Sequence, residues 1–145
     1  MASSIFKRNE IKKIAREILA MHPDIIAMEG PLGAGKTTLA KAIAKELGIK
    51  DVVVSPTFVL SAQYPVLSTQ LDHIDAWRVD SFDEIERLGL AEMIKNNHLV
   101  IIEWADKFAE EIKRLSNEDT KIVWVKIEYA DSDDERRITY ENIGN

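Results

Sequence analysis

Apolar residues follow two patterns along the chain: short uninterrupted runs, and longer segments in which they recur every three or four positions. Residues 24–28 and Leu99–Glu103 are uninterrupted runs, which are typical of strands buried on both faces of a sheet. Residues 9 to about 21 and residues 40–47 carry apolar side chains at helical spacing. These patterns predict two buried strands and two helices, the first helix capped by Asn9 and the second ended by Gly48.

The middle of the chain predicts shorter elements. Residues 51–65 indicate extended segments interrupted by a Ser-Pro step at 55–56, because proline disfavours the helical conformation in the residue before it. Residues 71–75 predict a further strand with a weaker pattern. These segments add extended structure between the second helix and the buried run at Leu99–Glu103.

Two further helices are expected in the second half of the chain. Ser81 and Glu84 have the spacing of a capping box, which predicts a short helix that ends near Gly89. Apolar residues within 108–115 share one helix face, and Asp106 is the expected cap of that helix.

The last third of the chain changes to strict alternation. Val123, Val125 and Ile127 alternate with other residues, and after the acidic turn at 130–135 a second alternating segment begins, so a terminal antiparallel hairpin is expected. The alternation of strands and helices before it predicts a three-layer α/β domain with a mixed, mainly parallel sheet. We expect residues 1–145 to form one domain.

Composition excludes several classes of protein. The chain has 145 residues, a formal net charge of −6 and no cysteine. An acidic balance argues against a protein that coats nucleic acid by itself, and the lack of cysteine excludes disulfides and thiolate metal sites. No apolar run approaches membrane-spanning length, so no membrane association is expected and the expected location is the cytoplasm.

The segment GPLGAGKTT carries the strongest chemical signal. Gly30, four intervening residues and then Gly35, Lys36 and Thr37 satisfy the Walker A pattern of a P-loop NTPase, between a predicted strand and a predicted helix. Glycines let backbone N–H groups turn around a phosphate, the lysine neutralises phosphate charge, and the threonine hydroxyl is suited to Mg²⁺. The expected phosphate-binding residues are Gly30, Leu32, Gly33, Ala34, Gly35, Lys36, Thr37 and Thr38.

Acidic residues at strand ends complete the predicted site. Glu103 ends a buried strand, which would deliver its carboxylate to the edge of the sheet beside the phosphate loop, to hold Mg²⁺ or orient a water. Asp75 is a similar candidate on a strand of weaker pattern. The segment Ser55-Pro56-Thr57 has the features of a switch that senses a γ-phosphate, although a plain turn explains it equally well.

Taken together, GPLGAGKTTLAKAIAKELG, SPTF, HIDAWR, EIERLGL and VIIEW resemble the TsaE (YjeE-like) ATPases in order and approximate spacing. These are small P-loop proteins of bacterial tRNA threonylcarbamoyladenosine (t⁶A) biosynthesis. The resemblance spans residues 30–104 and implies an ATP-hydrolysing protein with ATP and Mg²⁺ as cofactors. It also implies the TsaB–TsaD pair as partners, with tRNA reached through that complex.

The same resemblance implies roles for individual residues. Lys36, Glu103 and Asp75 would be catalytic, and Thr37 and Glu103 would hold Mg²⁺. Thr57 would belong to the switch and Trp104 would lie close to the nucleotide, so both join the ATP-binding set. The chain departs from the family at Ala76 and Trp77, where leucine and tyrosine are usual, and at Pro31, where relatives often have a polar residue.

Two other functions remain open at this level. A small P-loop kinase would need an acceptor pocket and arginines near the phosphates, and the chain has no arginine-rich insertion. In a binding-only module, ATP would set a conformation without turnover. Lys12 and Lys13 belong to a basic N-terminal segment that indicates a solvated helix face or, less simply, a contact with tRNA.

Overall fold

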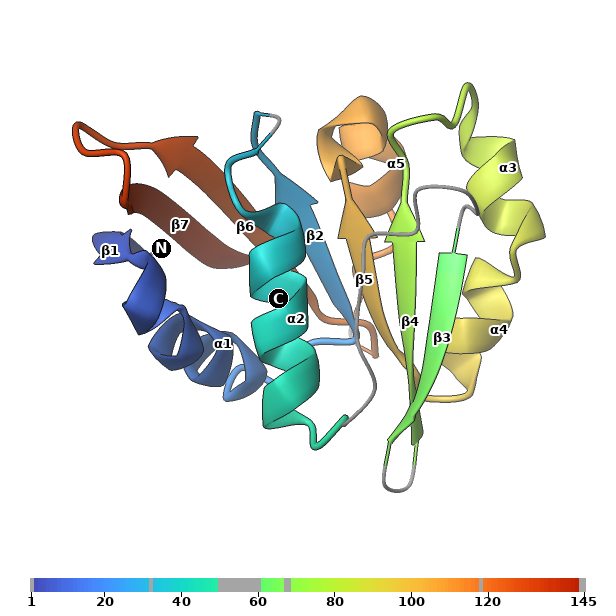
Figure 1. Cartoon of the computed structure of the whole chain (residues 1–145). Coiled ribbons are helices and arrows are strands. Elements are labelled where there is room, and N and C mark those ends of the chain that lie inside the picture. The colour runs from blue at the N-terminus through green and yellow to red at the C-terminus, as the bar shows by residue number, and fades with distance from the viewer. Residues whose placement is uncertain (1, 32, 50–60, 67–68, 118, 144–145) are drawn as a thin grey trace.

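The computed structural model describes residues 2–31, 33–49, 61–66, 69–117 and 119–143. In this part of the chain seven strands form one sheet, in the spatial order β1-β7-β6-β2-β5-β4-β3 (Figure 1). The strands are β1 (Ala2–Lys7), β2 (Ile25–Glu29), β3 (Ser61–Val66), β4 (Thr69–Asp75), β5 (Leu99–Glu103), β6 (Ile122–Tyr129) and β7 (Glu135–Ile143).

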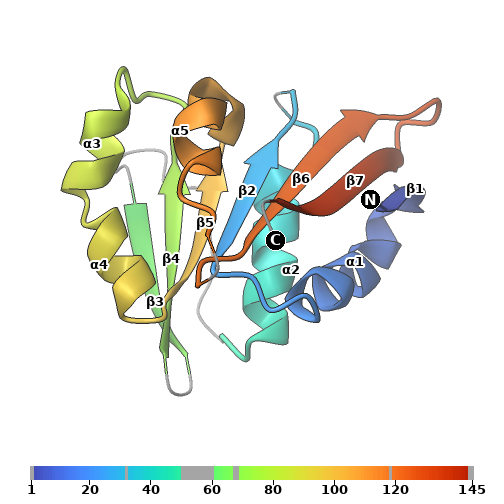
Figure 2. The ribbon, with the colours of Figure 1, turned by 180° about the vertical axis from the view of Figure 1, so that it is seen from behind.

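Helices cover both faces of this sheet, which gives the predicted three layers. Helices α1 and α2 pack on the face turned toward the viewer in Figure 1, and α3, α4 and α5 pack on the opposite face, seen in Figure 2. The helices are α1 (Ile11–Leu19), α2 (Lys36–Glu46), α3 (Phe82–Arg87), α4 (Leu90–Lys95) and α5 (Ala109–Lys113), with 3₁₀ turns η1 (Arg8–Glu10) and η2 (Ala105–Phe108). No helix in the described ranges is long and apolar enough to cross a bilayer.

Parallel strands form the centre of the sheet. Strands β6, β2, β5 and β4 run parallel to one another. At one side β7 pairs antiparallel with β6 and β1 antiparallel with β7, and at the other side β3 pairs antiparallel with β4. Parallel strands end at the same edge, and here Glu103 lies opposite both Met28 on β2 and Asp75 on β4. The register therefore brings both predicted acidic residues to the strand ends that flank the loop after β2.

Two apolar cores explain the uninterrupted runs. Along β2, Ile26 and Met28 point into the core under α1 and α2, whereas Ile25 and Ala27 point into the core under α3, α4 and α5. All four side chains are fully buried. A central strand covered on both faces has no polar side, so its sequence does not alternate.

Most predicted elements are confirmed, including the capping box of α3 at Ser81 and Glu84, the end of α2 before Gly48, and the β6–β7 hairpin. The predicted Asn9 cap is wrong. Helix α1 begins at Ile11 after the turn η1, and its N-cap is Glu10, whose Oε1 accepts the Lys7 backbone N–H at 3.0 Å. The extra turn moves the start of the helix beyond Asn9.

The predicted Asp106 cap is also wrong. Asp106 lies inside the turn η2, and helix α5 follows at Ala109 without a side-chain cap. Two elements were not predicted: β1, whose sequence has little apolar pattern, and α4, which follows directly after the α3 end at Gly89. The predicted switch at 55–57 and the other extended residues before Ser61 lie outside the described residues.

Candidate functional site

The loop between β2 and α2 has the backbone form that the Walker A pattern predicts. Gly33 and Gly35 have φ of 77° and 117°, values that L-residues with side chains rarely adopt, and Gly35 is the N-cap of α2. At Gly30 a Cβ atom would lie 2.5 Å from the Ile127 carbonyl oxygen, so only glycine fits against β6. The loop therefore turns tightly and presents the N-terminus of an eleven-residue helix toward its own interior.

Lys36 is buried at the base of this loop. Its Nζ donates hydrogen bonds to the carbonyl oxygens of Gly30 at 2.5 Å and Pro31 at 3.1 Å, and it lies 3.8 Å from the centroid of the Trp104 ring. Burial lowers the pKa of the Lys36 amine, and the charges of Glu103, Asp106 and Asp75 oppose that shift. The amine is thus held in place by backbone acceptors and has acidic residues nearby.

Thr37 and Glu103 meet directly at the strand edge. The Thr37 hydroxyl lies 3.1 Å from Glu103 Oε1 and 3.3 Å from Oε2, and the carboxylate is only 2% exposed. His73 on β4 is fully buried, with its Nε2 2.5 Å from Glu103 Oε2. This carboxylate therefore has contacts from two different elements, α2 and β4.

The donor set at this point fits Mg²⁺. A hydroxyl and a carboxylate within hydrogen-bond distance are hard oxygen ligands, which Mg²⁺ prefers. No group of three or more His, Asp or Glu side chains that could enclose a metal occurs among the residues described. Mg²⁺ usually binds proteins through one or two oxygens, with phosphate and water completing the shell.

Two tryptophans close one side of the site. The Trp77 and Trp104 rings pack with centroids 4.4 Å apart. Asp75 Oδ1 accepts the Trp77 backbone N–H at 2.9 Å, so Asp75 shapes the turn that carries this ring. Trp104 has a left-handed φ of 60°, an uncommon conformation for a bulky residue and one that often marks a functional site.

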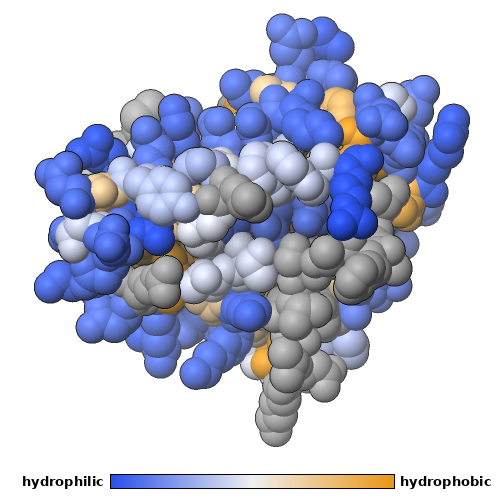
Figure 3. All heavy atoms as spheres, turned by 45° about the horizontal axis from the view of Figure 1, so that its top comes forward, coloured by the Kyte–Doolittle hydropathy of each residue, from blue (hydrophilic) through white to orange (hydrophobic). Residues whose placement is uncertain are grey.

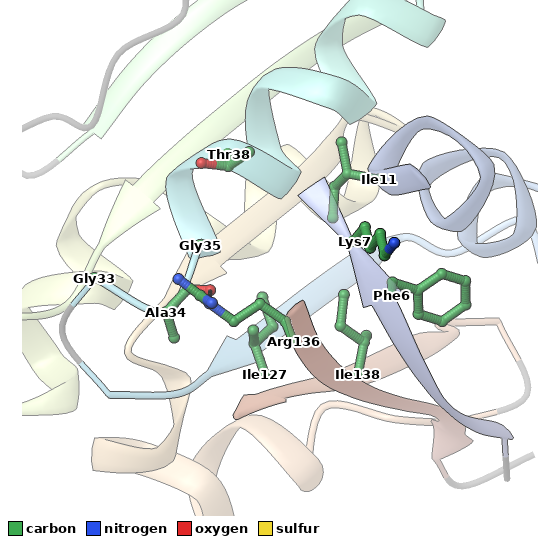
Figure 4. Close-up of a pocket in the computed structure, with 10 residues that line it drawn as sticks. All are labelled: Phe6, Lys7, Ile11, Gly33, Ala34, Gly35, Thr38, Ile127, Arg136 and Ile138. Atoms are coloured by element: carbon green, nitrogen blue, oxygen red, sulfur yellow. Dashed lines mark hydrogen bonds between the residues drawn. The ribbon is translucent and has the colours of Figure 1, made fainter. Parts of the chain in front are cut away.

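A pocket that the sequence did not predict lies beside the loop (Figure 4). Arg136 Nε donates to the Ala34 carbonyl at 2.9 Å, and its guanidinium lies 4.6 Å from the Tyr129 ring. The lining residues come from β1, the start of α1, the loop, the first turn of α2, β6 and β7: Phe6, Lys7, Ile11, Gly33, Ala34, Gly35, Thr38, Ile127, Arg136 and Ile138. No local pattern joins segments so far apart, so sequence reasoning had no signal for this pocket.

The edge of the sheet that carries the loop is mainly polar. Figure 3 looks toward this edge and shows mostly hydrophilic and intermediate residues, with hydrophobic ones in small separate patches. Trp77 is a large apolar side chain that is nevertheless exposed to solvent, at 52%. Two of the predicted site residues, Leu32 and Thr57, lie outside the described residues. The others gather around Lys36: the remaining loop residues, Asp75, Glu103 and Trp104.

The site joins a strand, a glycine loop and a helix that begins with Lys-Thr, and this helix faces an acid on the neighbouring parallel strand. That arrangement defines a P-loop NTPase-type α/β fold. The family model described as "Threonylcarbamoyl adenosine biosynthesis protein TsaE" matches residues 5–138. The chain therefore belongs to the TsaE family.

Similar proteins agree with this assignment. The chain is 40% identical over 138 residues to the tRNA threonylcarbamoyladenosine biosynthesis protein TsaE of Bacillus subtilis, covering 94% of this chain and 82% of that protein. The protein of the same name from Streptomyces coelicolor is 34% identical over 125 residues, which cover 83% of this chain and 81% of that one. A crystal structure of Bacillus subtilis YdiB superimposes with a TM-score of 0.68 at 29% identity, covering 99% of this chain and 88% of that chain.

Proposed function

We propose that this protein is a Mg²⁺-dependent ATPase that serves tRNA threonylcarbamoyladenosine biosynthesis in the cytoplasm, as a partner of the TsaB–TsaD complex. The observation that carries the proposal is the convergence of Lys36, Thr37 and Glu103 at the glycine loop. Family membership supports the pathway, because the relatives carry that role in their names.

The loop residues would hold the phosphates. Backbone N–H groups from Gly33 to Thr38 and the N-terminus of α2 suit an anion, and Lys36 would exchange its carbonyl acceptors at Gly30 and Pro31 for phosphate oxygens. Thr37 and Glu103 would hold Mg²⁺, which neutralises charge that develops on the phosphates. Glu103 or Asp75 would orient the attacking water, because both carboxylates lie at strand ends beside the loop.

The pocket beside the loop would hold the nucleoside. Ile11 offers apolar surface to a base, while the cations of Lys7 and Arg136 suit the ribose–phosphate side. The pocket adjoins Gly35 and Thr38, where the phosphates would lie, so one ligand can occupy both (Figure 4). Adenine contacts on β1 and β7 would complete the ATP site.

We expect slow hydrolysis by the protein alone. Trp104 covers Lys36, and the half-exposed Trp77 packs on the Trp104 ring. A partner that contacts Trp77 would therefore act on Lys36 through these two rings. In P-loop proteins a partner commonly completes the positioning of the water and the switch. TsaB–TsaD should therefore increase the rate of ATP hydrolysis.

Nucleotide titration and phosphate release test this function. The unsubstituted protein should bind ATP and ADP at millimolar Mg²⁺ and release free phosphate slowly. Lys36→Ala should abolish measurable binding, because it removes the charge that faces the phosphates. Glu103→Gln should keep nucleotide binding and lower turnover by about a hundredfold, the usual cost of losing one transition-state contact.

The same assay separates the alternatives. Following the γ-phosphate distinguishes an ATPase from a kinase, since transfer to a small acceptor would overturn the proposal. Binding of ATP without any phosphate release, with TsaB–TsaD present, would show a binding-only module. Unchanged turnover in Glu103→Gln would disprove the role given to that carboxylate.

A further inference from the structure

His73 stands out as a buried polar residue that the proposed function does not yet use. It lies in the middle of β4, it is fully buried, and its Nε2 is 2.5 Å from Glu103 Oε2. Its other ring nitrogen, Nδ1, has no hydrogen-bond partner among the described residues. A buried polar side chain with one atom unsatisfied costs stability, so its retention needs a reason.

The sheet register explains how the two side chains meet. In the parallel pair β4–β5, His73 lies opposite Ile101, and Asp75 lies opposite Glu103. Side chains two residues apart on a strand share a face, so His73 and Glu103 both project toward α2 and meet diagonally. Thr37, the first-turn residue of α2, reaches the same carboxylate from that side.

Hydrogen-bond chemistry assigns the proton in this contact. A carboxylate only accepts, so the proton between the two groups belongs to His73 Nε2. The His73–Glu103 contact is therefore a hydrogen bond from Nε2 to Oε2.

We propose that His73 is a positioning residue that fixes the Glu103 carboxylate toward the Mg²⁺ site. This inference rests on the proposed function. With Oε2 occupied by the imidazole, the carboxylate cannot rotate freely, and Oε1 stays 3.1 Å from the Thr37 hydroxyl. Partners that orient a metal-binding carboxylate typically change metal affinity or activity by about 10- to 100-fold when they are removed.

Two amide substitutions test the position of the donor. His73→Gln can place its amide nitrogen near the place of Nε2, whereas His73→Asn is shorter and places it near Nδ1. We expect His73→Gln to keep the Mg²⁺ concentration for half-maximal ATP hydrolysis within about threefold of the parent value. We expect His73→Asn and His73→Leu to raise it by about tenfold or more.

Nucleotide binding gives a readout that does not depend on turnover. ADP binding without Mg²⁺ should be the same in all three variants and in the parent protein, because the loop contacts are unchanged. The gain in ATP affinity on adding Mg²⁺ should shrink in His73→Asn and His73→Leu and persist in His73→Gln.

His98 provides the matched control. Its Nδ1 lies 2.7 Å from Oδ2 of the fully buried Asp72 on β4, so a second histidine–carboxylate pair joins β4 to the residue just before β5. His98→Leu should lower the melting temperature much as His73→Leu does and leave the Mg²⁺ response unchanged.

Specific outcomes would overturn the inference. One is that His73→Leu loses stability like His98→Leu but keeps the parent's Mg²⁺ response; another is that His73→Gln and His73→Asn behave alike. Failure of every His73 variant to fold would assign the residue a structural role instead. If the parent protein itself does not bind nucleotide, the proposed function fails, and that result is separate from these.

Discussion

At the residue scale, the site depends on positions where no other residue type fits. Gly30 packs against β6 so closely that a Cβ atom would lie 2.5 Å from the Ile127 carbonyl oxygen. Lys36, six residues further along the chain, donates a hydrogen bond to the Gly30 carbonyl oxygen. A shift of the backbone at Gly30 therefore moves an acceptor of the lysine that we propose faces the phosphates.

Gly30→Ala should destabilise the protein and abolish nucleotide binding, because the added methyl forces the loop away from β6. Gly48→Ala is the control, since Gly48 has a φ of 84° but no atom within 4 Å of an added Cβ. The control should cost only the strain of a left-handed alanine, about 1 kcal/mol, and keep ADP binding. Denaturant unfolding and ADP titration measure both, and similar results for the two variants would disprove the close-packing argument.

Sequence reasoning at this scale predicted that the loop residues, Glu103 and Asp75 would lie close together, because the Walker pattern and strand-end acids are local features. It also identified Ser81 and Glu84, whose capping box depends on four consecutive residues. It failed at Asn9 and Asp106, where short 3₁₀ turns come before the α-helices. Those turns follow from how the chain leaves the neighbouring strand, which residue type alone does not determine.

At the element scale, helix α1 is tied to β7 by a polar contact. The Tyr140 hydroxyl donates a hydrogen bond to Glu17 Oε2. Burial raises the pKa of the Tyr140 phenol to about 12, and the hydrogen bond to Glu17 and its negative charge act in the same direction. The neutral phenol is therefore favoured in the folded protein.

Stability should consequently fall at alkaline pH. The ordinary phenol pKa is 10.0, so the contribution of Tyr140 is fully present below pH 10 and is lost as the pH rises toward 12. Denaturant unfolding should show a steeper loss of stability over that range in the parent protein than in Tyr140→Phe. Equal slopes in the parent and Tyr140→Phe would contradict the assignment.

At the scale of the whole molecule, the sheet order joins the two ends of the chain. β1 pairs with β7 at one side of the sheet, and residues from both strands line the pocket beside the loop. Phe6 is buried in the core under α1 and α2, whereas exposed Lys7 lies at the pocket. The candidate nucleoside site thus exists only when the first strand is in place.

Deleting residues 1–7 should weaken binding of the nucleoside more than binding of the phosphates. The deletion removes the buried Phe6 side chain, worth roughly 1.5–3 kcal/mol, so the melting temperature should fall. ADP affinity should fall by more than the affinity for inorganic tripolyphosphate, because the loop after β2 remains. Isothermal titration of both ligands measures this, and an equal loss for both would show that the nucleoside does not use the pocket.

The sequence by itself determined the buried strands, the glycine loop with its following helix, and the terminal hairpin. These depend on periodicity and on the backbone conformations that neighbouring residues allow, which a local pattern records. Only the tertiary structure decided that His73 meets Glu103, that Trp104 covers Lys36, and that β1 completes a pocket with β7. Each of those contacts depends on strand order and register between segments far apart in the chain, and packing of the whole sheet is what selects them.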